Sequence, residues 1–213
     1  MIGVTICSPE FSELARIAAD KFTKHTGLAS VVLLTQQGKN YIAKFELHTM
    51  FNGQTVVYFD ADLWFINDCD LSGFDDQDRF LAVKDAGVYE DDHFPKHDCN
   101  VLDLDIDSYF NAGFFIWNDR HKEVFESAAQ IYEARKNYLK DFGEQSCLNA
   151  AVQSMSKVGL ISNSFNYIPF AEKHNMRAME YLRNPLTIHA AGYGLENKMQ
   201  ALLGLEAKYK LKL

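Results

Sequence analysis

The sequence predicts an α/β fold in which a mostly parallel central sheet is flanked by helices. Two features carry this prediction. An apolar strand, an amphipathic helix and a second strand follow one another over residues 2–34, and the run VVYF at 56–59 has the β-branched and aromatic character of a buried strand. A strand–helix–strand succession requires a crossover, and such crossovers join parallel strands. We therefore expect functional residues at the carboxyl ends of the strands, where sheets of this kind bind ligands.

The size and charge of the chain limit its class. The 213 residues fit one domain, 1–213, and 47% of them are apolar, enough for a substantial core. A formal net charge of −8 argues against a nucleic-acid partner, because binding a phosphate backbone requires a basic face. The sequence has neither a transmembrane segment nor the pattern of a signal peptide. Four scattered cysteines without a C-x-x-C pair favour reduced thiols and a cytoplasmic location.

The first strand is predicted at residues 2–7, and the second at 30–34. Between them, apolar residues recur at the spacing of one helical face until Gly27, which favours the end of a helix. The residues of this apolar face are Phe11, Leu14, Ala15, Ala18 and Phe22.

The remaining elements follow from short apolar runs and helical spacing. Strands are predicted at 80–83, 114–117, 158–161 and 186–189, and helices over about 119–139, from about 144 and from about 195. Neither an internal repeat nor a low-complexity linker interrupts the chain, which supports the prediction of one domain.

The segment 89–108 is predicted to be a mobile loop. Its alternating aspartates at 103–107 indicate a solvated strand face. Pro95 argues against a helix that would present His93 and His97 one turn apart to a zinc ion.

Asp60 and Asp62 directly follow the strand at 56–59. Two carboxylates at this place would repel each other and lose hydration unless a cation lay between them. Mg²⁺ and Mn²⁺ commonly bind one or two carboxylates together with substrate phosphates. An Asp-Ala-Asp triplet is nevertheless a weak signal by itself, because most such triplets are solvated turns.

Several segments, taken in order, resemble one enzyme family. They are AKFELHTMFNGQTVVYFDAD, which contains Lys44 and Asp60, followed by VKDAG, YFNAGFFIW, DFGEQSCLN and IHAAGYG. This order resembles the glycogenin-like glycosyltransferases, which share the Rossmann-like GT-A fold with bacterial lipopolysaccharide galactosyl- and glucosyltransferases. The resemblance spans most of the chain. The chain also resembles a glycosyltransferase module of multidomain capsid-glycosylation proteins of large algal viruses, which would make it part of a longer chain in the host cytoplasm.

The resemblance implies a metal and a donor. Asp60 and Asp62 would bind Mn²⁺, with Mg²⁺ as the alternative, and the ion would carry the diphosphate of a UDP-sugar. His189 matches the third protein ligand of the family, although a lone histidine on a strand is more often a core residue. The nucleotide-binding part would cover about 1–66, and the acceptor-side part about 67–213.

Further site residues follow from the same resemblance. Thr5 and Cys7 would lie by the uracil, and Lys44 would reach the donor. Asp85, Asn111 and Asp141 would hydrogen-bond sugar hydroxyls, because carboxylates and amides satisfy such donors. The other expected donor-site residues are Ala61, Gly113, Gln145, Gly192 and Lys198. The candidates for catalysis are Glu144, Asp141 and Asp85.

Two departures from the family pattern bear on mechanism. The Asp-Gln of the family is Glu144-Gln145 here, which is one methylene longer. Lys198 stands nine residues after His189, where the family has a lysine after six. The roles of Glu144 and Lys198 are therefore open to test.

The resemblance implies a metal-dependent enzyme that transfers a hexose from a UDP-sugar, UDP-glucose or a related one, to a glycan or glycoprotein acceptor. One alternative is a sugar-nucleotidyltransferase. It would need a glycine-rich, basic loop after the first strand, and Ser8-Pro9-Glu10 is neither. The other alternative is a catalytically inactive module that binds a sugar nucleotide or a glycan.

Overall fold

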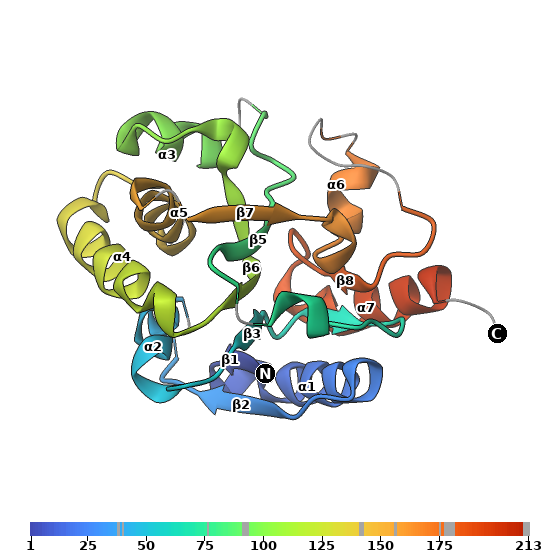
Figure 1. Cartoon of the computed structure of the whole chain (residues 1–213). Coiled ribbons are helices and arrows are strands. Elements are labelled where there is room, and N and C mark those ends of the chain that lie inside the picture. Colours follow the sequence, from blue (N-terminus) through green and yellow to red (C-terminus); the bar gives the residue numbers. More distant parts are fainter. Residues whose placement is uncertain are drawn as a thin grey trace.

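The computed structural model describes residues 1–37, 39, 41–75, 77–90, 94–140, 143–155, 157–174, 176 and 182–210 (Figure 1). The strands are β1 Ile2–Cys7, β2 Ser30–Leu34, β3 Val56–Phe59, β4 Leu63–Phe65, β5 Phe80–Lys84, β6 Phe110–Trp117, β7 Val158–Ile161 and β8 Thr187–His189. The helices are α1 Ser12–Thr26, α2 Leu47–Met50, α3 Phe94–Leu102, α4 Lys122–Arg135, α5 Glu144–Ser154, α6 Pro169–Lys173 and α7 Leu195–Tyr209. None of the helices in this part of the chain is long and apolar enough to cross a membrane.

The central sheet has six strands in the order β2-β1-β3-β6-β5-β7, and β4 and β8 form a separate two-stranded sheet. Strand β1 runs parallel to both β2 and β3, and β5 runs parallel to β7. Strand β6 is antiparallel to its neighbours β3 and β5. The predicted α/β fold with a mostly parallel sheet is therefore confirmed, with β6 as the reversed strand.

Two apolar layers cover the two faces of the sheet. In β3, Val57 and Phe59 pack in the layer that contains α1 and α7, whereas Val56 and Tyr58 pack in the layer that contains α4 and α5. This alternation is the period of two that a strand imposes on its side chains. Figure 1 shows α4 and α5 on the left of the sheet and α7 on its right. Because both faces of β3 are covered, Asp60 becomes partly accessible only in the turn that follows the strand, where Asp62 also lies.

Strand β6 begins earlier than the sequence indicates. The apolar run predicts residues 114–117, but β6 covers Phe110–Trp117 because pairing with β5 continues past a β-bulge to Asn111 and Phe110. Asn111 and Gly113, which precede the predicted strand, therefore lie within β6. Helix α4 is also shorter than its predicted span of about 119–139: a 3-10 turn capped by Asn118 precedes it, and the helix ends at Arg135.

The prediction of a loop over 89–108 is wrong for its central part, which forms α3. Pro95 lies in the first turn of this helix, where the missing N–H costs nothing. The aspartates form a turn and not a strand face, since Asp105 accepts hydrogen bonds from the N–H of Asp107 and the hydroxyl of Ser108. His93 lies outside the described residues.

Candidate active site

The two aspartates lie in the tight turn between β3 and β4. The N–H of Asp60 donates to the carbonyl of Gly113 in β6 (2.9 Å), and the carbonyl of Asp60 accepts from the N–H of Leu63 (2.9 Å). Tyr58, two residues earlier in β3, donates its hydroxyl to a carboxylate oxygen of Asp60 (2.6 Å). Hydrogen bonds thus fix both the backbone and the carboxylate of Asp60 where β3 ends.

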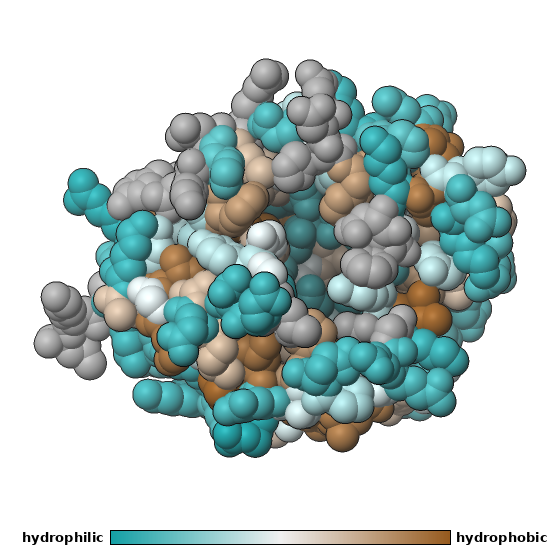
Figure 2. All heavy atoms as spheres, turned by 180° about the vertical axis from the view of Figure 1, so that it is seen from behind, coloured by the Kyte–Doolittle hydropathy of each residue, from teal (hydrophilic) through white to brown (hydrophobic). Residues whose placement is uncertain are grey.

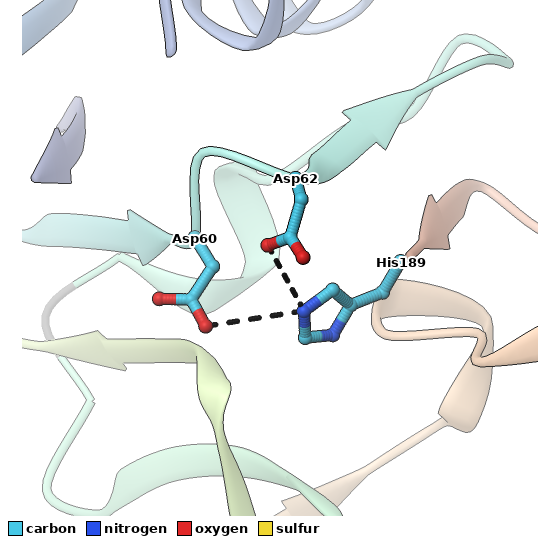
Figure 3. A group of neighbouring side chains, drawn as sticks. All are labelled: Asp60, Asp62 and His189. Atoms are coloured by element: carbon cyan, nitrogen blue, oxygen red, sulfur yellow. Dashed lines mark ion pairs between the residues drawn. The ribbon is translucent and has the colours of Figure 1, made fainter. Parts of the chain in front are cut away.

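His189 reaches the same place from the far end of the chain. It is the last residue of β8 and pairs with Leu63, the first residue of β4. Its Nε2 lies 3.3 Å from a carboxylate oxygen of Asp62 and 3.9 Å from one of Asp60, as Figure 3 shows. Taken together, the three side chains offer ligand atoms that all lie within 4.8 Å of one another.

This donor set fits a divalent metal ion. Two carboxylates and an imidazole are ligands that Mn²⁺ accepts, and the pair of carboxylates also suits Mg²⁺. The side chains of Asp62 and His189 are 12% and 4% exposed, whereas that of Asp60 is 28% exposed. A cation held here would therefore have one open side, toward the cavity described below.

Lys198 supplies a positive charge next to these carboxylates. It belongs to α7, and its ammonium contacts a carboxylate oxygen of Asp62 and donates to the carbonyl of Ala190 (3.1 Å). Burial alone would raise the pKa of Asp62, but His189 and Lys198 outweigh it and hold this pKa below its ordinary value. The nine-residue spacing from His189 therefore still places the lysine at the site.

Lys44 forms a second buried charge cluster with two carboxylates. Its Nζ lies 3.1 Å from Asp60 and 3.3 Å from Glu144, and it donates to the carbonyl of Ala112 (3.1 Å). Burial opposes the charge on Lys44, but the two carboxylates outweigh it and raise the pKa of its ammonium. Burial, with a contribution from Asp60, raises the pKa of Glu144 despite the nearby ammonium. Glu144 is thus a better proton acceptor than an ordinary carboxylate.

Asp85 is the centre of a hydrogen-bond network behind the cavity. One of its oxygens accepts from the amides of Asn111 (3.0 Å) and Gln145 (3.1 Å), and the other accepts from the N–H of Gly87 (2.8 Å). Gln145 in turn accepts a hydrogen bond from the N–H of Ala112 (2.9 Å). The network ties the beginning of α5 to β6.

A cavity of about 300 Å³ lies over these groups. Its lining includes many of the residues expected from the sequence: Cys7, Lys44, Asp60, Ala61, Asp62, Asn111, Gly113, Glu144, Gln145, His189, Gly192 and Lys198. Figure 2 shows the molecule hollowed near the centre of the view, with hydrophilic residues deep in the hollow. The fold thus brings most of the site residues expected from the sequence to one cavity.

Three expected residues stand apart. Thr5 is fully buried in β1 and Asp85 lies behind the cavity, so neither lines it, and Asp141 lies outside the described residues. Other lining residues were not foreseen: Ile6, Phe11, Tyr41, Tyr58, Phe94, Gly143 and Ala191. Tyr58 could have been predicted from the sequence, because residues two apart in a strand lie on the same side, which places Tyr58 beside Asp60.

The fold has close counterparts among solved structures. The galactosyltransferase LgtC, in complex with donor and acceptor sugar analogues, matches with a TM-score of 0.71 at 14% identity over 100% of this chain and 98% of its own. The glycosyltransferase GlyE of Streptococcus pneumoniae TIGR4 matches with a TM-score of 0.64 at 12% identity over 99% and 65% of the two chains. The chain has the GT-A glycosyltransferase fold. A glycosyltransferase involved in the glycosylation of the major capsid of PBCV-1 matches with a TM-score of 0.63 at 8% identity over 95% of this chain and 98% of its own.

Sequence comparison adds nothing to this GT-A likeness: no family model matches the chain, and no curated protein sequence matches it.

Proposed function

We propose that this chain is a metal-dependent glycosyltransferase that transfers a hexose from a UDP-sugar to a glycan or glycoprotein acceptor. The observation that carries the proposal is the convergence of Asp60, Asp62 and His189 on one cavity of a GT-A fold. The donor and acceptor sugar analogues in the LgtC structure support a two-substrate reaction in a site of this kind.

Asp60, Asp62 and His189 would hold the metal ion, Mn²⁺ in the first place and Mg²⁺ as the alternative. Bound there with the donor, the ion would stabilise the charge that develops on the leaving diphosphate. Lys198 contributes a further positive charge at the same edge of the cavity, since its ammonium already contacts Asp62. This lysine would meet phosphate oxygens when a donor enters.

The part of the chain over about 1–66 would bind the nucleotide, and the part over about 67–213 would face the sugar and the acceptor. Ile6, Cys7 and the ring of Phe11 line the cavity near the end of β1. Apolar and aromatic side chains of this kind suit the faces of a planar base such as uracil.

Asn111 is positioned to orient the donor sugar. It lines the cavity, and its amide donates one of its two hydrogens to Asp85 (3.0 Å), so the second can meet a sugar hydroxyl. Asp85 would act through Asn111 and Gln145, because it binds both amides from behind the cavity.

Glu144 would accept the proton of the acceptor hydroxyl. It lines the cavity and has a raised pKa, which favours accepting a proton near neutral pH. The resembled family retains the anomeric configuration, and we expect retention here. A Glu144 that acts as general base during direct attack on the anomeric carbon would give inversion instead.

The proposal is tested by incubating the protein with a panel of UDP-hexoses and measuring the release of UDP, with Mn²⁺ and with a chelator. We expect release only with the metal ion, and its loss in Asp62→Asn. Asp68→Asn is the matched control, because the side chain of Asp68 is 91% exposed and lies outside the cavity lining. No metal-dependent turnover with any UDP-hexose would contradict an active transferase.

Related measurements separate the two alternative functions. Release of pyrophosphate from a nucleoside triphosphate and a sugar phosphate would indicate a nucleotidyltransferase. Binding of a UDP-sugar without turnover would indicate an inactive binding module.

Thermal shifts with UDP, ADP and GDP test which base the site prefers, because a ligand of the folded state raises its stability by mass action. Equal shifts with all three would remove the uridine assignment.

A further inference from the structure

The imidazole of His189 makes a second contact, on the side away from the aspartates. Its Nδ1 lies 2.8 Å from the amide oxygen of Asn166. Both residues are nearly inaccessible, with 3% and 2% exposed. The backbone adds a second tie between the two segments, since the N–H of His189 donates to the carbonyl of Tyr167 (2.8 Å). Asn166 was not among the residues singled out in the sequence.

The orientation of the Asn166 amide follows from groups whose roles are fixed by their chemistry. An ionised carboxylate only accepts hydrogen bonds and a backbone N–H only donates. Asn111 therefore turns its NH₂ toward Asp85 (3.0 Å) and its oxygen toward the N–H of Gly113 (2.9 Å). The same oxygen of Asn111 accepts from the NH₂ of Asn166 (2.9 Å). The amide oxygen of Asn166 is left facing the imidazole.

The consequence concerns the tautomer of the ring. Because the Asn166 oxygen is an acceptor, Nδ1 carries a proton, and Nε2 is the nitrogen that faces Asp60 and Asp62 and can bind an ion between them once it gives up its own proton. We propose that Asn166, itself oriented by Asn111 and Asp85, is a positioning residue that prepares His189 to bind the metal ion. This inference rests on the metal site of the proposed function.

Packing holds the ring in the same pose. A Cβ added to Gly113 would lie 2.4 Å from Cε1 of His189 and 2.8 Å from the amide oxygen of Asn111. The imidazole of His189 and the amide of Asn111 thus both pack directly against the backbone of β6. Glycine at position 113 leaves the space that the hydrogen-bonded series Asp85, Asn111, Asn166 and His189 requires.

The first test measures Mn²⁺ affinity by electron paramagnetic resonance of the free ion. Asn166→Ala should bind Mn²⁺ roughly 10- to 100-fold more weakly, the usual effect of losing the partner of a ligating histidine. Asn166→Asp keeps an oxygen acceptor at Nδ1 but loses the NH₂ that donates to Asn111, so it should lose less affinity than Asn166→Ala. Asn118→Ala removes a buried asparagine at the start of α4 and should leave the affinity unchanged.

A double variant shows whether Asn166 acts through the ring. In a His189→Ala background, Asn166→Ala should weaken Mn²⁺ binding by less than about twofold, because coupled residues are not additive. An equal loss in both backgrounds would assign Asn166 a merely structural role and overturn the inference. So would parent-like affinity of Asn166→Ala, or a loss in Asn166→Asp as large as that in Asn166→Ala.

The Nδ1 proton itself is read in the metal-free protein by ¹H–¹⁵N correlation of labelled histidine, which reports each ring nitrogen separately. The chain has seven histidines, and the His189→Ala variant identifies the signal of interest. We expect a proton on Nδ1 in the parent and in Asn166→Asp, and its loss in Asn166→Ala, which leaves Nε2–H alone. A parent ring protonated on Nε2 alone would overturn the inference even if Mn²⁺ binds. An Nδ1–H parent that binds no Mn²⁺ would support the tautomer and contradict the proposed function.

Discussion

The ammonium of Lys44 lies 3.3 Å from the carboxylate of Glu144, and the two side chains are only 3% and 9% exposed. Lys44 also lies 3.1 Å from Asp60, so it connects the carboxylate at the metal site with the carboxylate at the start of α5. Charge at one end of this cluster therefore affects the other end, because buried charges are weakly screened.

Glu144→Gln should reduce transfer by roughly a hundredfold or more, the expected magnitude for a lost general base. Binding of the UDP-sugar should persist, because the amide has the same shape. Steady-state kinetics and a binding titration separate the two effects, and NMR of the product gives the anomeric configuration. Full activity would make this carboxylate structural and leave Asp141 as the remaining catalytic candidate, because Asp85 does not line the cavity.

Lys44→Met should destabilise the fold by about 3 kcal/mol, because it leaves two carboxylates near each other without a cation. Adding Glu144→Gln should restore part of the loss, since the remaining charge is then Asp60 alone. Arg16→Met is the control for an exposed ion pair, as Arg16 and Asp20 are 68% and 69% exposed, and it should change stability by less than about 0.5 kcal/mol. Chemical denaturation measures all three, and equal effects at Lys44 and Arg16 would argue against a buried cluster.

Metal and nucleotide should bind as one unit. With Mn²⁺ and UDP at about 100 times its dissociation constant, we expect the parent to gain about 2.7 kcal/mol in unfolding free energy. Asp60→Asn and Asp62→Asn should each lose this gain while the unliganded protein stays folded. Each variant gives up an ion pair, Asp60 with Lys44 and Asp62 with Lys198, so the unliganded protein should lose some stability without unfolding. Parent-like stabilisation of both variants, measured by thermal unfolding, would contradict the shared ion.

The ion pair between Lys21 of α1 and Glu206 of α7 (2.6 Å) should make stability depend on pH. Burial alone would raise the pKa of Glu206, but Lys21 and Lys210 outweigh it and lower this pKa. A carboxyl group whose pKa is lower in the folded protein stabilises the fold at any pH above its ordinary pKa. This stabilisation is lost as the pH falls through the pKa of the folded state. Glu206→Gln should therefore cost about 1 kcal/mol near neutral pH and almost nothing once the pH is below the pKa of Glu206 in the folded protein. A pH-independent difference would assign the loss to packing.

Local patterns in the sequence were enough for most of the fold. The strand at 56–59 and the helix after the first strand depend on periodicity within a few residues, and both form where they were predicted. The segment 89–108 shows where such reasoning failed. Pro95 was taken as a helix breaker, although a proline is compatible with the first turn of α3.

The site itself divides in the same way. The sequence determined that Asp60 and Asp62 leave a buried strand together, because two residues of a tight turn are neighbours in any fold. Only the tertiary structure decided that β8 pairs with β4 and brings His189 to them, and that Asn111 and Asn166 connect His189 to Asp85. The physical reason is that hydrogen-bond partners are chosen by distance and orientation in space, and these residues come from segments whose separation along the chain says nothing about either.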